Sequence, residues 1–229
     1  MLQRLNRKLN ILFEPRRNTI LARGKTKYFC IGCNKTGTTS IKKAFEDLGY
    51  PVGNQRIAER LTDRYYFKGD FVPVIAYCKS AQVFQDVPFS LPETFKYLDR
   101  AYPGSKFILT VRDDAEQWYQ SITKFHAKLF GKGAIPTAEN LRAARYVRKG
   151  FVYRGVKLFG APDEDIYNKE ILIRHYEQYN QDVLNYFRER PDDLLVINLA
   201  EKDSYQKFIA FLGIDSPFQD FPWENRTPE

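Results

Sequence analysis

The segment that most constrains the fold of this chain is Tyr28–Ile41, which reads YFCIGCNKTGTTSI. Its first four residues are apolar, which is typical of a short buried strand ending at Ile31. Gly32 and Gly37 then bound a tight loop, and the residues that follow predict a helix that ends at Gly49. A strand, a glycine-bounded loop and a helix N-terminus bring backbone N–H groups and the positive end of the helix dipole to one point. The segment therefore predicts a phosphate site.

The position of the lysine separates this loop from the ATP-binding P-loop, G-x-x-x-x-G-K-[ST]. Gly32 and Gly37 have the P-loop spacing, but Thr38 occupies the lysine position and Lys35 precedes the second glycine. The sequence KTGTTS resembles the 5′-phosphosulfate loop of sulfotransferases, whose donor is PAPS (3′-phosphoadenosine 5′-phosphosulfate). The resemblance implies that the donor is held by Asn34, Lys35, Thr36, Gly37, Thr38, Thr39 and Ser40. The alternative is a Gly/Thr-rich turn that binds no ligand.

A second sulfotransferase motif follows the clearest strand of the sequence, Lys106–Val111. The strand ends at Arg112-Asp113-Asp114, and a helix is predicted from there to about Phe130. In the family an arginine at this position and a serine on the helix hold the 3′-phosphate of PAPS, and the resemblance gives these roles to Arg112 and Ser121. The usual family spacing falls on Gln120, so the serine comes one residue later than in the family pattern.

A third segment supplies candidates for the general base. Val83–Val87 is predicted to be a strand ended by proline, and in cytosolic sulfotransferases a similar strand ends in a Thr-His-Leu-Pro-like segment whose histidine is the base. Asp86 stands in the place of that histidine. The resemblance makes Asp86 the first candidate, and His126 is the second because imidazole titrates near neutral pH. His175 is far in sequence from every motif, and we expect it to be structural.

Strands and helices alternate along the rest of the chain. The remaining predicted elements are helices near Ile57–Leu61, Val72–Cys78, Leu91–Tyr102 (with Ser90 and Glu93 as a capping box), Lys169–Arg190 and Ser204–Leu212, and a strand at Leu194–Asn198. This order predicts an α/β fold of three layers, α/β/α, with a mainly parallel central sheet and extra helices in the C-terminal half. The resemblance makes it a P-loop NTPase-like sulfotransferase fold. Lys35, Asp86 and Arg112 each follow a strand, so we expect them to meet at the carboxyl edge of the sheet.

The 229 residues fit one domain, residues 27–229, preceded by a basic arm or helix at residues 1–26. Leucines from Leu2 to Leu12 share one helical face, so this segment either makes a peripheral membrane contact, docks on an anionic partner or packs on the domain. The net charge of +8 suggests an anionic ligand, and an anionic nucleotide meets this expectation, so we expect no nucleic-acid partner. No apolar run approaches the ~18 residues of a membrane span, and we expect a cytoplasmic protein.

Two other chemistries deserve comparison with this interpretation. Cys30 and Cys33 form a C-x-x-C pair, but Cys30 lies inside the predicted strand, where cysteine is usually a small buried apolar residue. Asp113 or Asp114 resembles the Walker-B acid of a kinase, which requires the P-loop lysine that is missing here. Capping of the following helix by an aspartate is an equally good interpretation. We expect neither redox chemistry nor a metal.

The segment Thr137–Phe159 is rich in arginine and lysine. Arg142, Arg145 and Arg148 have the spacing of one helical face. This face either clamps an acidic or sugar acceptor, helps to close over the donor, or is simply solvated.

The sequence thus predicts a PAPS-dependent sulfotransferase that moves the sulfuryl group to a hydroxyl or amine acceptor by in-line displacement and releases PAP. Lys35 would stabilise the leaving phosphate. The C-terminal Phe-Pro-x-x-Asn segment resembles the end of bacterial sulfotransferases, which places Arg226 near the donor. A glycan, a lipid and a small phenol are all compatible with the sequence as the acceptor. The alternatives are a P-loop kinase or NTPase, and a non-catalytic module that binds an anionic partner.

Overall fold

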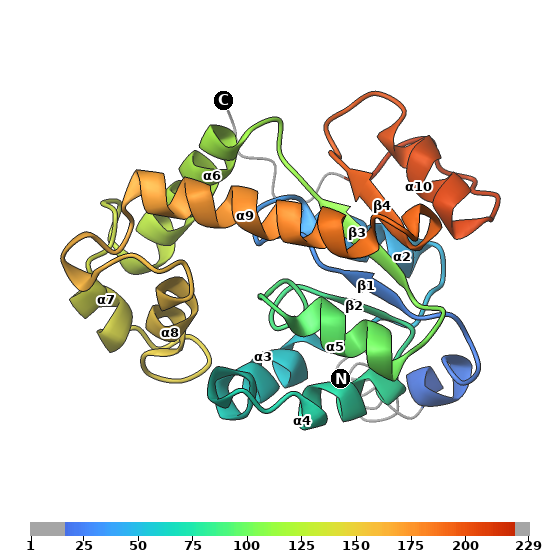
Figure 1. Cartoon of the computed structure of the whole chain (residues 1–229), viewed down its shortest axis with the longest axis horizontal. Helices are drawn as coiled ribbons and strands as arrows, with labels where there is room; N and C mark the ends of the chain where they lie inside the picture. The colour runs from blue at the N-terminus through green and yellow to red at the C-terminus, as the bar shows by residue number, and fades with distance from the viewer. Residues whose placement is uncertain (1–16, 223–229) are drawn as a thin grey trace, which may run out of the picture.

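The computed structural model describes residues 17–222, and its centre is a sheet of four parallel strands in the order β2-β1-β3-β4 (Figure 1). The strands are β1 (Tyr28–Cys30), β2 (Val83–Gln85), β3 (Lys106–Thr110) and β4 (Leu194–Ile197). Each predicted strand is present and is one or two residues shorter at its C-terminal end. The prediction of a mainly parallel sheet is confirmed.

Helices cover both faces of the sheet (Figure 1). They are α2 (Thr38–Asp47), α3 (Gln55–Arg64), α4 (Val72–Tyr77), α5 (Thr94–Ala101), α6 (Ala115–Phe130), α7 (Ala138–Ala143), α8 (Phe151–Lys157), α9 (Lys169–Phe187) and α10 (Ser204–Leu212), with short 3-10 turns at Tyr66–Lys68, Cys78–Ser80, Asp163–Asp165 and Pro191–Asp193. The predicted three-layer α/β/α arrangement is therefore confirmed.

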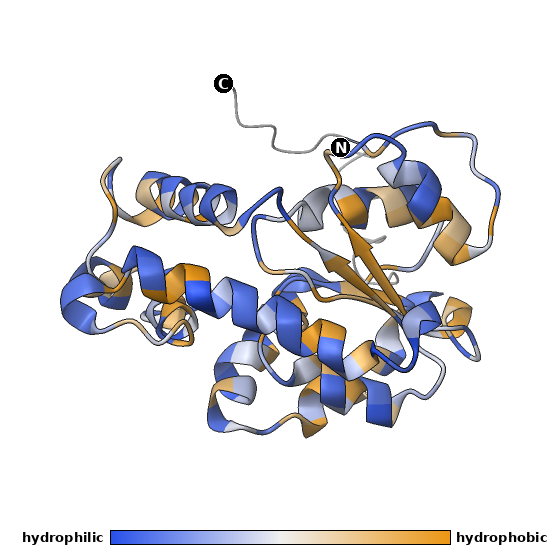
Figure 2. Ribbon diagram, turned by 45° about the horizontal axis from the view of Figure 1, so that its top comes forward, coloured by the Kyte–Doolittle hydropathy of each residue, from blue (hydrophilic) through white to orange (hydrophobic). Residues whose placement is uncertain are grey.

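Successive side chains of β1 point to opposite faces of the sheet and belong to two different hydrophobic clusters. Tyr28 and Cys30 pack with α2 and α10, whereas Phe29 packs on the opposite face with residues of α5 and α9. Figure 2 shows the strands as mainly apolar, while the long helix α9 carries polar residues on its outer side. A strand buried on both faces reads as a continuous apolar run, which is why β1 and β3 could be predicted from sequence.

The order of the strands fixes the position of the ligand site. β1 pairs with β2 on one side and with β3 on the other. The connection from β1 therefore leads to β2 on one side, and the connection from β2 then crosses back over β1 to β3 on the other side. Cys30 lies opposite both Gln85 and Ile108, and the segments after these strands end at one edge of the sheet. In parallel sheets ligands bind where the direction of the connections reverses. The loop after β1 lies at this point.

The start of α5 corrects one prediction. Ser90 and Glu93 do not form a capping box: α5 begins at Thr94, and Glu93 is its N-cap with φ 66° and no side-chain cap. Residues 88–93 form consecutive turns, and the Ser90 hydroxyl donates to Asn34 Oδ1 at 3.2 Å. A contact across 56 residues of sequence has taken the hydroxyl that was expected to cap the helix.

The basic segment corrects another prediction. Arg142 lies on α7, but that helix ends at Ala143, and Arg145 pairs as an isolated antiparallel bridge with Lys149. α8 begins only after Gly150, whose φ of 75° suits a residue without a side chain. Arg142, Arg145 and Arg148 therefore do not share one helical face. α7 and α8 lie beside α9 and away from the sheet (Figure 1).

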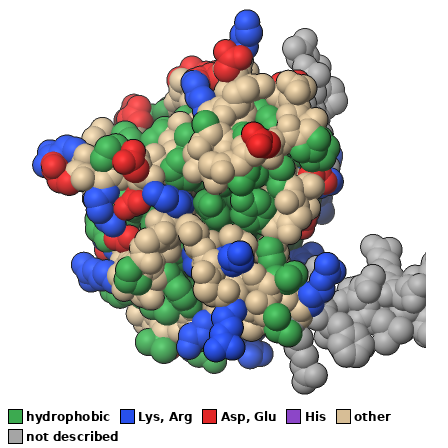
Figure 3. Space-filling model, turned by 90° about the vertical axis from the view of Figure 1, so that its right-hand side faces the viewer, with side chains coloured by type: hydrophobic (Ala, Val, Ile, Leu, Met, Phe, Trp, Pro, Cys, Tyr) green, Lys and Arg blue, Asp and Glu red, His purple; other side chains and the backbone are tan. Residues whose placement is uncertain are grey.

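No helix within residues 17–222 has the length and apolar character needed to cross a membrane. The leucine-rich segment from Leu2 to Leu12 lies outside the described residues. On the face shown in Figure 3, acidic and basic side chains are mixed in the upper part around a central apolar area, whereas the lower part carries basic side chains.

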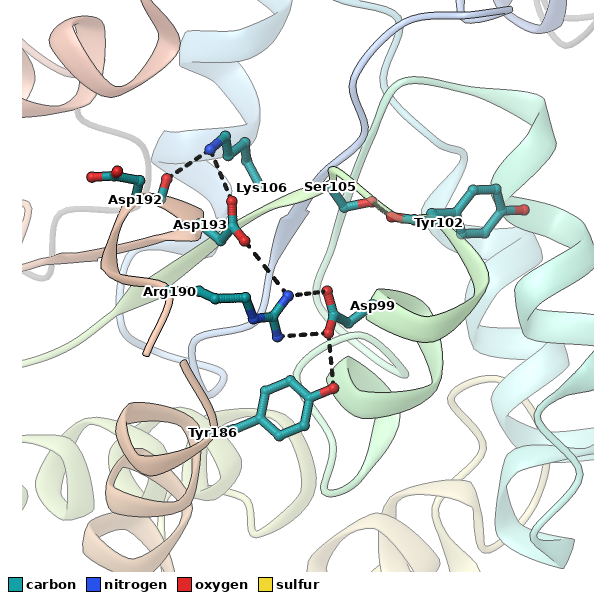
Figure 4. A network of polar contacts seen from close by, with 8 residues as sticks. All are labelled: Asp99, Tyr102, Ser105, Lys106, Tyr186, Arg190, Asp192 and Asp193. Atoms are coloured by element: carbon teal, nitrogen blue, oxygen red, sulfur yellow. Dashed lines mark hydrogen bonds and ion pairs between the residues drawn. The ribbon is translucent and has the colours of Figure 1, made fainter. Parts of the chain in front are cut away.

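A network of charged side chains connects the end of α9 to α5 and to the first residue of β3 (Figure 4). Arg190 donates to both carboxylate oxygens of Asp99 on α5, at 2.8 and 3.1 Å, and Tyr186 donates to the same carboxylate at 2.8 Å. Lys106, the first residue of β3, pairs with Asp193 at 2.9 Å. Bidentate arginine pairs of this kind are among the stronger charged contacts in proteins.

We expect Asp99→Asn to lower the free energy of unfolding by about 1–2 kcal/mol at neutral pH. Partial burial alone would raise the pKa of Asp99, but hydrogen bonds from Arg190 and Tyr186 outweigh it and lower the pKa. The stabilisation should therefore be complete above the ordinary pKa of about 3.9 and disappear as the pH falls through the lower folded value. Urea unfolding between pH 3 and 7 measures the difference. Asp192→Asn is the matched control, because the Asp192 carboxylate points away from the network (Figure 4); equal effects of both substitutions would contradict the assignment.

Candidate active site

A cavity of about 820 Å³ lies beyond the carboxyl ends of β1, β2 and β3. Ligand pockets commonly measure roughly 300–1,000 Å³, so this one lies toward the upper end of that range. Most of the predicted site residues line it: Asn34, Lys35, Gly37, Thr38, Thr39, Ser40, Asp86, Arg112, Ser121 and His126.

The loop between β1 and α2 is held tightly against β3. A side chain at Gly32 would bring its Cβ to 2.0 Å from the Thr110 hydroxyl and 2.5 Å from the Thr110 carbonyl oxygen, so only glycine fits. Thr36 is buried under the loop, where its hydroxyl donates to the Cys33 carbonyl at 2.6 Å and lies 2.5 Å from the Thr110 hydroxyl. Thr36 therefore supports the loop from below and does not line the cavity.

The start of α2 is open to a ligand. Its N-cap is Gly37, with φ 101°, and no side chain caps the helix. The first N–H groups of an α-helix have no partner within the helix, and the helix dipole makes this end positive. Thr38 and Thr39, the first two residues of α2, lie on the cavity. The geometry matches a site for an anionic group.

Two cations stand together at this loop. Arg112 donates from Nε to the Lys35 carbonyl oxygen at 2.6 Å, and both side chains line the cavity. Burial lowers the pKa of Lys35, and the charge of Arg112 lowers it further. Burial likewise lowers the pKa of Arg112. Within residues 17–222 neither side chain forms an ion pair, and the charges of Asp86 and Asp113 offset those of Lys35 and Arg112 only in part. This arrangement calls for an anion.

Asn34 connects the loop to its neighbours. Its amide nitrogen donates to Asp86 Oδ1 at 2.6 Å, and its amide oxygen accepts from Ser90. The Asn34 carbonyl oxygen accepts from Trp118 Nε1 at 3.0 Å, and the Trp118 ring stacks on Tyr176 of α9 at 4.7 Å. One asparagine thus fixes the relative positions of the loop, the end of β2 and α6.

Asp86 is held by the backbone as well as by Asn34. Its φ of 63° lies in the left-handed region, which aspartate tolerates better than most residues. Oδ1 accepts from Val87 N at 2.7 Å and from Asn34, which leaves Oδ2 without a hydrogen bond to residues 17–222. Burial raises the pKa of Asp86; the bonds from Val87 and Asn34 oppose this, the charge of Glu59 adds to it, and Lys35 opposes it.

The two histidines also lie on the cavity wall. His126 Nδ1 is 2.7 Å from the Tyr167 hydroxyl, and burial together with the charge of Lys35 lowers the pKa of His126 to about 4. His175, which we expected to be structural, packs on Phe159 at 4.9 Å between ring centroids, and burial lowers its pKa. Both imidazoles are therefore neutral at pH 7.

Two neighbouring residues of α6, Gln120 and Ser121, lie in different surroundings. Ser121 lines the cavity, whereas Gln120 is exposed and donates to Glu116 at 3.0 Å on the helix surface. The structure thus brings Ser121, and not Gln120, to the same cavity as Arg112. Arg226 lies outside the described residues.

A family model described as a sulfotransferase domain matches residues 27–229. The chain belongs to the sulfotransferase family. No curated protein sequence shows a significant match to it. Membership makes the protein a transferase of sulfuryl groups and agrees with the α/β fold and with the resemblance of the loop after β1.

The residues that suggested other chemistries have structural contacts in this sulfotransferase. Asp114 accepts from Gln117 N and caps α6, and Asp113 accepts from Gln117 Nε2 and Asn198, so both aspartates serve the start of the helix. Cys30 and Cys33 belong to core clusters on opposite faces of the sheet, and burial raises the pKa of both thiols, that of Cys33 to about 12. Among residues 17–222 no group of three metal-ligating side chains comes together.

Several residues of the site went unnoticed in the sequence. Phe125 places its ring 4.2 Å from Lys35 Nζ, and Glu59 brings a buried carboxylate to the cavity from α3. Trp118 lies one turn into the helix after Arg112, where an aromatic residue gives no signal that it bonds the loop. Their positions depend on contacts between distant segments, which periodicity does not reveal.

We expect Gly32→Ala to lower the free energy of unfolding by about 2 kcal/mol or more, because the methyl group would overlap the β3 backbone. Gly155→Ala on α8 is the matched control: its Cβ would meet no atom within 4 Å, and alanine favours a helix by up to about 1 kcal/mol. Urea unfolding of both variants provides the measurement. Equal stability of Gly32→Ala and the wild type would show that the loop is not held as described.

Proposed function

We propose that this sulfotransferase uses PAPS as its donor and transfers the sulfuryl group to a hydroxyl or amine acceptor, releasing PAP. The observation that carries the proposal is the pair of half-buried cations, Lys35 and Arg112, which form no ion pair within residues 17–222 and lie at the open N-terminus of α2. A donor with phosphate groups at two positions of one ribose would meet both the helix end and Arg112.

The residues present fit this donor. The loop N–H groups and the hydroxyls of Thr38 and Thr39 would hold the 5′-phosphosulfate end. Arg112 and Ser121 would hold the 3′-phosphate, and the planar guanidinium suits a bidentate contact with a phosphate. Bound PAPS supplies an activated sulfuryl group on a good leaving phosphate.

In the proposed step the acceptor oxygen forms a bond to sulfur as the bond from sulfur to the 5′-phosphate oxygen breaks. Lys35 would neutralise the charge that grows on that phosphate, and positioning with charge stabilisation supplies most of the rate. Phe125, whose ring lies at the Lys35 ammonium, helps to hold this side chain in place.

The proton of the acceptor would go to Asp86. Asp86 lines the cavity, its Oδ2 accepts no hydrogen bond from residues 17–222, and burial raises its pKa, which improves a carboxylate as a base. The pKa of His126, by contrast, is lowered to about 4, so its imidazole is the weaker proton acceptor. Both environments favour Asp86.

Calorimetric titration with PAP tests the donor. We expect PAP to bind without magnesium and Arg112→Ala to weaken it by about 30-fold or more, because a phosphate loses its charged partner. Arg174→Ala, which removes an exposed arginine of α9, is the control and should leave the affinity unchanged. Preference for ATP with magnesium would support a kinase or NTPase instead. PAP binding without any sulfuryl transfer by the wild type would support a non-catalytic module.

The pH dependence of kcat tests the base. Because Asp86 acts in its deprotonated form, we expect the wild-type rate to fall as the pH drops through the raised pKa of Asp86. Asp86→Asn should lower kcat by roughly 10²–10⁴ and remove this acidic limb. Lys35→Ala should lower kcat by roughly 10²–10³ while the limb persists. A larger loss in His126→Gln than in Asp86→Asn would assign the base to His126.

A further inference from the structure

His126 has no part in the proposed step, although it lines the cavity together with Lys35. It lies on α6 directly after Phe125, whose ring is 4.2 Å from the Lys35 ammonium. The imidazole is close enough to Lys35 for the lysine charge to lower the pKa of His126. A neutral ring with two nitrogen atoms therefore stands near the cation that would stabilise the leaving phosphate.

The hydroxyl of Tyr167 determines which nitrogen of that ring carries the proton. His126 Nδ1 lies 2.7 Å from this hydroxyl, which has no other acceptor among residues 17–222. Tyr167 is 3% exposed, and burial raises its pKa, so the hydroxyl keeps its proton at pH 7. If Nδ1 carried the ring proton, the buried hydroxyl proton would be left without a partner, which costs about 1–3 kcal/mol. The contact therefore favours a bare Nδ1, which accepts from Tyr167, and a protonated Nε2.

Tyr167 is itself held in place against α6. The Tyr119 hydroxyl donates to the Tyr167 carbonyl oxygen at 3.0 Å, and Tyr119 lies two turns before His126 on the same helix. The rings of Tyr167 and Phe130 pack edge-on against the imidazole, with centroids at 5.8 and 5.6 Å. Aromatic surroundings of this kind disfavour a charged imidazole. The orientation and the neutral state of the ring are thus set by residues outside the donor loop.

We propose that His126 is a neutral hydrogen-bond donor to the sulfuryl group during transfer, and that the Tyr167 hydroxyl holds its Nε2–H in this role. The inference rests on the proposed function. His126 Nε2 forms no hydrogen bond to residues 17–222, so its N–H is available to a ligand in the cavity that the ring lines. A fixed donor in such a site is worth most where negative charge lies on the group being transferred.

A neutral donor suits a site that already holds two cations. A charged imidazole would be a third positive charge beside Lys35 and Arg112, whereas a neutral N–H contributes a hydrogen bond without further repulsion. The acceptor proton passes to Asp86 in the proposed step, so His126 keeps its own proton throughout. His126 would be a catalytic residue, and Tyr167 a positioning residue that acts through it.

Long-range 15N–1H NMR of the whole chain reads the tautomer without any turnover. The chain has only two histidines, so His175→Gln assigns their signals. We expect His126 at pH 7 to have a protonated Nε2 and a bare Nδ1, and Tyr167→Phe to give a mixture of the two tautomers. A protonated Nδ1 or a charged ring in the wild type would overturn the proposal, as would an unchanged tautomer in Tyr167→Phe.

The same signals test the contact with the sulfuryl group. PAPS and PAP differ in that group alone, so we expect PAPS to move the Nε2–H proton resonance downfield and PAP to move it much less. Equal shifts with the two nucleotides would place the N–H away from the sulfuryl group. Failure of the wild type to bind PAP in the calorimeter would instead overturn the proposed function, and this inference with it.

Two substitutions of His126 separate a donor from a base. Glutamine places an amide N–H near the position of Nε2, whereas leucine is of similar size and has no donor. The assay follows labelled PAPS with water as the acceptor: the water oxygen bonds to sulfur as the bond to the 5′-phosphate oxygen breaks, which gives labelled sulfate and PAP. We expect His126→Leu to lower kcat by roughly 10² and His126→Gln by less than about tenfold, with KM for PAPS within about threefold in both.

Other patterns of loss contradict the donor role. Equal large losses in the two variants would indicate a base, because an amide cannot take the proton, and wild-type kcat in both would indicate a structural role. A Kd for PAP within about twofold of the wild type in each variant shows that the site is intact. If His126→Leu does not fold, the comparison of PAPS with PAP in the NMR spectrum of the wild type still decides the matter.

Discussion

The close approach of the loop after β1 to the backbone of β3 is the constraint on which the site depends. The absence of a side chain at Gly32 lets the loop lie against Thr110, and Thr36 then bonds to Thr110 from below. With the loop pinned there, the Lys35 carbonyl oxygen is within reach of Arg112, and Asn34 is within reach of Asp86. Three strand ends thus act as one rigid frame. Rigid support of this kind is what positions charged groups within the tolerance that catalysis requires.

The frame holds charges in positions that oppose folding. Lys35 and Arg112 are partly desolvated and repel each other, and Lys35 and Asp86 both adopt left-handed backbone angles, with φ of 75° and 63°. Conformations of this kind cost about 1–2 kcal/mol per residue and persist where surrounding contacts enforce them. An anion bound between the cations would remove the repulsion. Binding of such an anion would therefore also raise the stability of the fold.

Features that depend on local sequence patterns could be predicted, whereas features that depend on contacts between distant segments could not. The strands and the meeting of Lys35, Asp86 and Arg112 could be predicted, because apolar runs mark buried strands and parallel strands end at one edge. The cap assigned to Ser90 was wrong, since its hydroxyl bonds Asn34 from a distant segment. The helical face assigned to Arg142, Arg145 and Arg148 was wrong because the chain breaks into two short helices. Spacing describes the helix that an unbroken segment would form; it does not show where the chain breaks or which distant carboxylates hold Arg142 and Arg148.

The two short helices α7 and α8 have a consequence for how acceptor choice can change. They lie away from the sheet; α8 contacts α3 through the ion pair of Arg154 with Asp63, and apolar residues of both helices join the core cluster on one face of the sheet. α8 thus supplies part of the cavity wall without belonging to the frame formed by the three strand ends. Substitutions there can reshape the acceptor space while leaving Gly32, Thr36 and their contacts intact. Donor recognition and acceptor preference can therefore evolve at different rates within one fold, which would let closely related chains share a donor and modify chemically unrelated compounds.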